Sequence, residues 1–281
     1  GKLFQRSDAK ISVFDSGFLL GDGVWEGIRL HKSKLVFIEE HIDRLFTSAK
    51  GISLDIPLSR ENIIDELNKV LKKNNMNDDI HIRLIISRGD KITPYQNPNA
   101  NVGPINFVII PEYKKTNPDT YIQGISIGRV PNTRPNENIL SPQYNTLSKL
   151  NCILASIEAN KLGYDEGIMN DINGNISTCN STNLFFIQDN QVITSKGEYC
   201  LNGITRGKVI EVCHENNIQC NKINFTFKDI ENCDEAFVTG TFAGIIPVAK
   251  LENKKLKSIN PSSTVNKIRK LYNKKIEEYI G

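Results

Sequence analysis

The sequence lacks the features that mark several specialised classes of protein. No apolar run approaches about 18 residues, so no membrane-spanning helix is expected, and the start of the chain is not signal-like, although Gly1 is not an initiating Met. The formal net charge is only +3. No basic run alternates with aromatic residues, so neither nucleic acid nor a membrane surface is an expected partner.

The six cysteines form no C-x-x-C pair, and they build no metal-ligand spacing with the four histidines. Irregularly spaced cysteines of this kind are typical of reduced thiols. We therefore expect a cytoplasmic protein that holds no metal.

The length and composition suit a globular protein with two packed domains. The chain has 281 residues, of which 39% are hydrophobic and 24% are charged. A polar, proline-containing segment near residue 118 predicts a linker. We expect an α+β protein with a small N-terminal α/β domain (1–113), a linker (114–120) and a larger C-terminal domain (121–281).

Two helices predicted in the larger domain matter for function. The first spans about 146–162, and its apolar spacing predicts a buried stripe. That stripe would contain Leu147, Leu150, Ile153, Leu154 and Ile157. The second helix begins at Gly203 and runs to about 214, and its first turn offers unpaired backbone N–H groups to an anion.

Three separate segments suit a phosphate group. Thr205 adds a hydroxyl donor at the start of the second helix, and Thr239-Gly240-Thr241 ends a strand predicted to be buried. Arg44 is the candidate countercharge. Each feature alone has an ordinary structural explanation, namely a helix cap, a strand end or a solvated arginine.

Four ordered motifs give the chain a family resemblance. They are DSGFLLGDGVWEGIR near the start, then HIDRL, LNGITR and DEAFVTGTFAGIIPV near the end. With these motifs the chain resembles the class IV (fold type IV) pyridoxal-phosphate enzymes over nearly its whole length. The class includes branched-chain and D-amino acid aminotransferases, (R)-amine transaminases and aminodeoxychorismate lyases.

The resemblance implies a cofactor, a fold and partners. The cofactor would be pyridoxal 5'-phosphate, and the larger domain would have a β-barrel-like core. The protein would be a homodimer that acts on an amino acid and a keto acid. The resemblance assigns the cofactor phosphate to Arg44, Ile204, Thr205 and Thr241 with the neighbouring Gly240, and it places Leu201 against the cofactor ring.

The same resemblance reveals two departures. With Ile153-Leu154-Ala155 and Glu158-Ala159 as anchors, the lysine that forms the Schiff base in the family falls on Asn145. With Gly174 and Asn183-Leu184-Phe185 as anchors, the glutamate that pairs with the pyridine nitrogen falls on Thr178. An amide can neither bond to the aldehyde carbon nor act as a base, and a threonine offers only a neutral hydrogen bond. No acid lies between Ile172 and Ile187 to replace the glutamate.

Lys149 is the candidate catalytic replacement. It follows Asn145 by four residues, which in a helix is one turn, or about 5–6 Å along the axis. The resemblance aligns Lys149 with a tyrosine that reaches the cofactor's phenolic oxygen in branched-chain aminotransferases. The alternative is an ordinary exposed lysine on a helix.

Substrate contacts are expected from the N-terminal domain. Trp25, Arg29, Arg83 and Arg88 are the aromatic and cationic candidates, and HIRLIISRG resembles the family strand that carries a pocket arginine.

Four functional hypotheses follow from these residues. The first is an aminotransferase for a branched-chain or D-amino acid, with Lys149 in place of the lost lysine. The second is a cofactor-free or inactive relative that binds a phosphorylated metabolite, and the third is a lyase of the aminodeoxychorismate type. In the fourth, Asn145 is an engineered replacement for lysine, although a single trapping mutation would have left a glutamate at Thr178.

Overall fold

The computed structural model describes all 281 residues and divides them into two compact units. The first unit contains residues 1–115 together with 144–149, and the second contains 116–143 and 150–281. The chain first passes between them within the expected linker. The expected domain ranges themselves stay a prediction.

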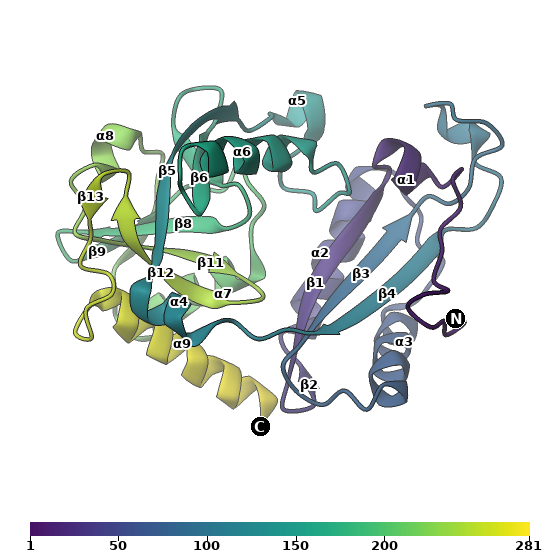
Figure 1. Cartoon of the computed structure of the whole chain (residues 1–281), viewed down its shortest axis with the longest axis horizontal. Helices are drawn as coiled ribbons and strands as arrows, with labels where there is room; N and C mark the ends of the chain where they lie inside the picture. Colours follow the sequence, from purple (N-terminus) through teal and green to yellow (C-terminus); the bar gives the residue numbers. More distant parts are fainter. The chain divides into compact units, whose positions relative to one another are not determined.

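The first unit is an antiparallel sheet packed against two helices (Figure 1). The strand order is β2-β1-β3-β4. The strands are β1 (Gly23–His31), β2 (Lys34–Leu35), β3 (Ile80–Ser87) and β4 (Asn106–Tyr113). The helical segments are α1 (Ser16–Leu20), α2 (Ile38–Gly51), α3 (Arg60–Lys73) and the short 3-10 helix η1 (Pro98–Ala100).

Alternation along β1 and β3 gives this sheet two different faces. The face toward α2 and α3 is apolar and forms the unit's core, with fully buried residues such as Ile28, Ile42, Leu67 and Ile82. The other face carries Trp25, Arg29, His81 and Arg83, because β1 and β3 pair with Gly27 opposite Arg83 and Arg29 opposite His81. We call these four residues the polar face of the small sheet.

The returning segment 144–149 extends the edge of this sheet beside β1. Trp25 N donates to Asn145 O (3.0 Å), Leu147 N donates to Gly23 O (2.9 Å), and Val24 and Thr146 form a β-bridge. The residues before α6 are therefore extended rather than helical.

The second unit is built on a nine-stranded sheet (Figure 1). Eight strands follow the order β10-β9-β8-β11-β12-β5-β6-β7, and the ninth, β13, pairs with β12. Its strands are β5 (Ile125–Thr133), β6 (Glu166–Asn170), β7 (Ile176–Cys179), β8 (Asn183–Gln188), β9 (Gln191–Thr194), β10 (Cys220–Lys222), β11 (Glu235–Gly240), β12 (Gly244–Leu251) and β13 (Lys254–Lys255). Its helices are α4 (Pro118–Gln123), α5 (Glu137–Leu140), α6 (Leu150–Lys161), α7 (Ile204–Glu215), α8 (Phe227–Ile230) and α9 (Thr264–Ile280).

Hydrogen bonds between the ends of this sheet curl it toward closure. Ile223 N, just after β10, donates to Thr194 O on β9, and two residues later Phe225 O accepts from Ile176 N on β7. A short segment thus bonds to strands at both ends of the sheet order. The expected α+β class, with a barrel-like core in the larger part, is confirmed.

The expected helix from 146 to 162 is wrong in two respects. The helix, α6, begins four residues later, at Leu150. Its large apolar side chains also point outward: Leu150 is 65% exposed and Ile153 is 52% exposed, whereas the buried residues are Ala155 and Ala159. Small residues allow the helix to approach the sheet closely, since the carbonyl oxygen of Ala155 lies 3.2 Å from where a Cβ on Gly167 would be.

Candidate functional site

The candidate residues fall in both units. The first unit holds Trp25, Arg29, Arg44, Arg83, Arg88 and Lys149, whereas the second holds Thr178, Leu201, Ile204, Thr205, Gly240 and Thr241.

The start of α7 in the second unit is shaped for an anion. Gly203 is the N-cap residue and provides no side-chain cap, so the first backbone N–H groups of the helix have no side-chain acceptor from that position. A Cβ on Gly203 would lie 2.4 Å from Oδ1 of Asn183, which explains the glycine. Asn183 Nδ2 donates to Leu201 O (2.9 Å) and thereby ties the approach to α7 to strand β8.

A strand end lies close to the same asparagine. Thr239 on β11 pairs in register with Asn183 on β8, and its hydroxyl is buried without a hydrogen-bond partner. The next residue, Gly240, has only the Thr182 methyl group near its missing Cβ, at 3.6 Å. A hydroxyl without a partner and the free backbone N–H groups of a helix start can both donate hydrogen bonds to phosphate oxygens. The second unit therefore fits the phosphate group of the expected cofactor.

Thr178 sits on β7 and is engaged within the protein. Its hydroxyl donates to Thr182 O (2.6 Å), while the hydroxyl of Thr182 donates to Glu166 (2.7 Å). Burial raises the pKa of the Glu166 carboxyl, although the hydroxyls of Ser181 and Thr182 partly offset this effect. The surroundings of Thr178 therefore contain an acid, Glu166, that lies outside the range between Ile172 and Ile187, where the sequence has none.

Two buried arginines surround the loop that leads to α7. Arg206 in the first turn of α7 donates to Ser195 O (2.5 Å) and to Asn202 Oδ1 (2.9 Å), and its Nε is buried without a partner. Arg134 donates to Asn151 Oδ1 (3.0 Å) and, across a longer contact, to Tyr199 O (3.4 Å). Burial lowers the pKa of Arg206. Every hydrogen-bond acceptor identified for these two guanidiniums is uncharged.

Arg44 in the first unit is instead paired with a carboxylate. Its Nε and Nη2 donate to the two oxygens of Glu26 (2.8 and 2.7 Å), and His41 Nδ1 lies 2.7 Å from the same carboxylate. Burial alone would raise the pKa of Glu26, but the charge and hydrogen bonds of Arg44, with those of His41, hold it below its ordinary value. Glu26 is completely buried and occupies one edge of the guanidinium.

The polar face of the small sheet gathers cations around an indole. The Arg83 guanidinium lies over the Trp25 ring, 3.7 Å from its centroid. His81 approaches in the space that Gly27 leaves, because a Cβ there would be 3.0 Å from the imidazole Nε2. Burial, together with the positive charges of Lys114 and Arg83, lowers the pKa of His81 to about 4. His81 is therefore neutral near neutral pH.

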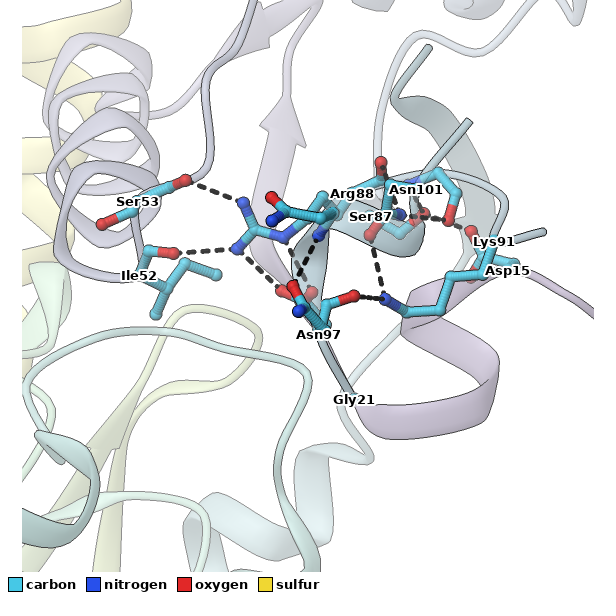
Figure 2. Close-up of polar contacts among 12 residues, drawn as sticks. Asp15, Gly21, Ile52, Ser53, Ser87, Arg88, Lys91, Asn97 and Asn101 are labelled. Carbon is cyan, nitrogen blue, oxygen red and sulfur yellow. Dashed lines mark hydrogen bonds and ion pairs between the residues drawn. The ribbon is translucent and has the colours of Figure 1, made fainter. Parts of the chain in front are cut away.

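Arg88 is held by the protein, as Figure 2 shows. Its Nε and Nη2 donate to both oxygens of Asp22, and Nη1 and Nη2 also donate to the carbonyls of Ser53 (2.7 Å) and Ile52 (2.8 Å). These bonds use four of the five donors that an arginine has. A substrate role for Arg88 stays a prediction that this geometry does not favour.

The loop after Arg88 is closed by a buried lysine (Figure 2). Lys91 Nζ donates to Asn101 Oδ1 (2.9 Å) and to Asn97 O (3.3 Å), and Asn101 Nδ2 donates to Gly89 O (3.1 Å). These bonds cross the loop, so they give its residues a structural role.

Asn145 is buried and bonded. Its Nδ2 donates to Trp25 O (2.7 Å), while its Oδ1 is buried without a partner. Lys149 is half-buried, and its ammonium lies 5.6 Å from the centroid of the Trp25 ring. Because the segment is extended, the helical spacing expected between Asn145 and Lys149 is wrong. Lys149 N instead donates to Leu147 O, two residues earlier (2.8 Å).

Several residues that shape these sites were missed from the sequence. Glu26 lies within the motif GVWEGIR and Arg206 within LNGITR, so the motifs themselves were the available signal. His41 and His81 likewise open the motifs HIDRL and HIRLIISRG, whereas for Arg134 and Glu166 no sequence signal separates them from ordinary polar residues. No group of three or more His, Cys, Asp or Glu side chains gathers to hold a metal, and no helix has the length and apolarity to span a membrane.

Comparison with known proteins identifies the family. The family model described as amino-transferase class IV matches residues 23–251. A branched-chain-amino-acid aminotransferase-like protein 2 of Arabidopsis thaliana is 35% identical over 255 residues, covering 90% of this chain and 45% of that protein. The chain thus spans about half the length of the first curated relatives it matches.

Two further similarities cover nearly full lengths. A putative branched-chain-amino-acid aminotransferase of Methanocaldococcus jannaschii is 34% identical over 274 residues, covering 97% of this chain and 93% of that protein. A T.th. branched-chain amino acid aminotransferase, complexed with N-(5'-phosphopyridoxyl)-L-glutamate, shares the fold, with a TM-score of 0.90 at 23% identity over 98% of this chain and 92% of that one. The chain belongs to the class IV aminotransferase family, whose members use pyridoxal 5'-phosphate.

Proposed function

We propose that the protein is a pyridoxal-phosphate-dependent aminotransferase of class IV. The observation that carries the proposal is the start of α7, where the uncapped Gly203 packs against Asn183 beside the buried, partnerless hydroxyl of Thr239. Family membership supports the same conclusion. When bound, the cofactor supplies an aldehyde that takes up an amino group and a ring that accepts electrons.

The cofactor phosphate is held by the second unit in this proposal. The backbone N–H groups of Ile204 and Thr205 and the strand end at Gly240 and Thr241 supply the contacts, and Leu201 packs on the ring. Arg206 and Arg134 add fixed positive charge near this loop. Arg44 contributes less charge than the resemblance implies, because Glu26 already neutralises it.

Lys149 supplies the amine. Asn145 and Thr178 occupy the positions where the family has its lysine and glutamate, and neither side chain can perform proton transfer at neutral pH. Lys149 is the amine nearest in sequence to Asn145, and it lies on the same face of the small sheet as Trp25 and Arg83. Its side chain would bond to the cofactor and then transfer the proton that amino transfer requires.

The substrate is an amino acid of the branched-chain or D type, with a keto acid as amino acceptor. Trp25 offers an apolar surface, and Arg29 and Arg83 offer charge for a carboxylate, all on the polar face of the small sheet. The protein acts as a homodimer. The outward apolar residues of α6, among them Leu150 and Ile153, are the surface that supports this assembly.

Reduction with borohydride tests the proposal. Purified protein is mixed with pyridoxal 5'-phosphate, reduced, digested and mapped by mass spectrometry. We expect a visible absorbance band before reduction and a fixed adduct on Lys149. Lys149→Met should remove both, whereas the matched change Lys161→Met, on exposed α6, should remove neither. A natural chain that forms no adduct at Lys149 would contradict the proposal.

A second candidate function is the non-catalytic binding of a phosphorylated metabolite. It is favoured by one observation: Asn145 and Thr178 are both built into hydrogen bonds, as structural residues would be. Calorimetry with pyridoxal 5'-phosphate and the Lys149→Met variant separates the two functions. Binding that is unchanged in the variant, with no amino transfer by the natural chain, would support the second candidate.

A further inference from the structure

Trp25 is the only tryptophan of the chain, and two cations share its ring. The Arg83 guanidinium lies 3.7 Å from the ring centroid, and the Lys149 ammonium lies 5.6 Å from it. Both distances are within the range of about 6 Å over which the π face of an aromatic ring attracts a cation. The indole therefore contacts the amine on which the proposed function depends.

The position of this ring is fixed by the segment that carries Lys149. The indole Nε1 donates to Thr146 O (3.1 Å), Trp25 N donates to Asn145 O (3.0 Å), and Asn145 Nδ2 donates to Trp25 O (2.7 Å). Three hydrogen bonds thus join Trp25 to the residues just before Lys149. The ring and the base of the lysine side chain cannot drift apart without breaking them.

Asn145 takes part in this arrangement. Its amide Nδ2 bonds to Trp25 O inside the protein, and only 1% of the residue is exposed. The residue at the family's lysine position thus helps to hold the indole against the replacement amine.

We propose that Trp25 is a positioning residue for Lys149. The indole holds the lysine side chain over one face rather than letting it sample many rotamers. After losing its proton to water, the amine would meet the cofactor aldehyde from that direction, and the aldehyde oxygen would leave as water when the amine bonds to the aldehyde carbon. A mobile lysine side chain has substantial rotamer entropy, which the contact removes before reaction. This inference rests on the proposed function, since it concerns the amine of that same site.

The contact is tested first by fluorescence, with Trp25 left in place. We expect Lys149→Met to change the emission intensity or wavelength of the single tryptophan, whereas Lys161→Met leaves the emission unchanged. The measurement needs no cofactor and no activity. Identical emission from the natural chain and from Lys149→Met would overturn the inference.

Positioning is tested next with Trp25→Phe and Trp25→Leu, both checked for folding by circular dichroism. The initial rate of adduct formation at Lys149 is measured with pyridoxal 5'-phosphate and borohydride, and adducts on the exposed Lys161 serve as an internal reference. We expect Trp25→Phe, which keeps a π face, to retain most of the rate. Trp25→Leu should lower it about 2- to 5-fold, the size of an exposed cation–π contact.

The two variants also distinguish the ring from the indole N–H, because both lose the hydrogen bond to Thr146. Equal losses in Trp25→Phe and Trp25→Leu would assign the effect to that bond and overturn the inference. So would an adduct rate at Lys149 that is the same in Trp25→Leu as in the natural chain. Absence of any Lys149 adduct in the natural chain is a different result, since it removes the proposed function itself.

Discussion

The largely buried arginines of the two units have opposite kinds of partner. In the first unit Arg44 and Arg88 each bond through two nitrogens to a carboxylate, that of Glu26 or Asp22. In the second unit Arg134 and Arg206 bond to carbonyl and amide oxygens. The first pattern cancels charge where it is buried, and the second leaves it in place.

This difference indicates where an anion is attracted. An ion pair presents little net charge to a third group, whereas a guanidinium held by neutral oxygens keeps its field. The second unit combines this field with the helix start at Gly203. The second unit is therefore the one in which buried guanidiniums keep uncompensated charge, as the proposed phosphate contacts require.

The largest expected effect comes from breaking the first pattern. Glu26→Ala leaves Arg44 and His41 in a buried position without their shared carboxylate. We expect the free energy of unfolding to fall by about 3–5 kcal/mol, the usual result of removing one partner of a buried ion pair. Urea unfolding followed by Trp25 fluorescence measures it, since Trp25 reports on the first unit.

Glu26→Gln is the matched control, because it keeps the shape and one acceptor oxygen but removes the charge. Its free energy of unfolding should lie between those of the natural chain and of Glu26→Ala. A Glu26→Ala variant as stable as the natural chain would mean that the pairing of Arg44 does not stabilise the first unit.

The next largest expected effect concerns His81, whose lowered pKa should make stability depend on pH. Its pKa in the folded protein is about 4, below the ordinary value of 6.5, so the unfolded chain binds the proton more readily between these pH values. Stability should therefore fall as the pH drops from 6.5 to 4, by about 2 kcal/mol after allowance for solvent screening. His81→Gln should flatten this part of the profile, measured by urea unfolding at each pH. An unchanged slope would show that His81 does not titrate as described.

Removing a guanidinium from the second unit should lower the free energy of unfolding less than removing the Glu26 carboxylate from the first unit. Arg206→Gln leaves the carbonyl of Ser195 short of its donor, which costs about 1–2 kcal/mol, but it also removes a buried charge. Thermal unfolding measured by circular dichroism tests this expectation. A loss larger than that of Glu26→Ala would contradict the comparison.

Binding of inorganic phosphate sharpens the same comparison. A single charge about 10 Å from an anion contributes about 1.7 kcal/mol at an effective dielectric constant near 20, so Arg206→Gln should weaken binding roughly 15- to 20-fold. Arg44→Gln should weaken it less, because Glu26 already offsets that charge. Isothermal titration calorimetry measures both. Equal losses in the two variants would show that Arg44 keeps an effective charge despite Glu26.

The fold class could be predicted from the sequence because its elements follow local patterns, whereas the phosphate contacts stay a prediction. LNGITR predicts a helix that begins at Gly203, and the structure starts α7 at Ile204. The helix expected at 146 was misplaced because apolar residues of α6 occur on more than one side, so periodicity cannot choose the buried stripe. That choice depends on how closely Ala155 and Ala159 approach the sheet.

The pairings in the candidate site were beyond the sequence for a different reason. Glu26 and Arg44 are 18 residues apart, and Arg206 and Ser195 are 11 apart, so each contact exists only once the tertiary structure forms. The relation of Lys149 to Trp25 depends on the chain returning to the edge of β1, where Trp25 bonds to Thr146, 121 positions later in the sequence. Residue type alone favoured a solvated arginine at Arg44, and it did not decide between a solvated and a catalytic Lys149.

The smallest expected effect tests whether burial, rather than pairing alone, distinguishes Arg44. Arg60 bonds to two carboxylates, those of Glu39 and Asp43, whereas Arg44 bonds to one, but the side chains around Arg60 are largely exposed. Water and salt screen such pairs, so Arg60→Gln should leave the unfolding midpoint unchanged within error. Urea unfolding of Arg60→Gln beside Glu26→Ala measures the contrast under one set of conditions. If Arg60→Gln lowered the free energy of unfolding as much as Glu26→Ala does, the number of carboxylates would matter more than their burial. Burial would then not explain the contribution of the Arg44–Glu26 pair to stability.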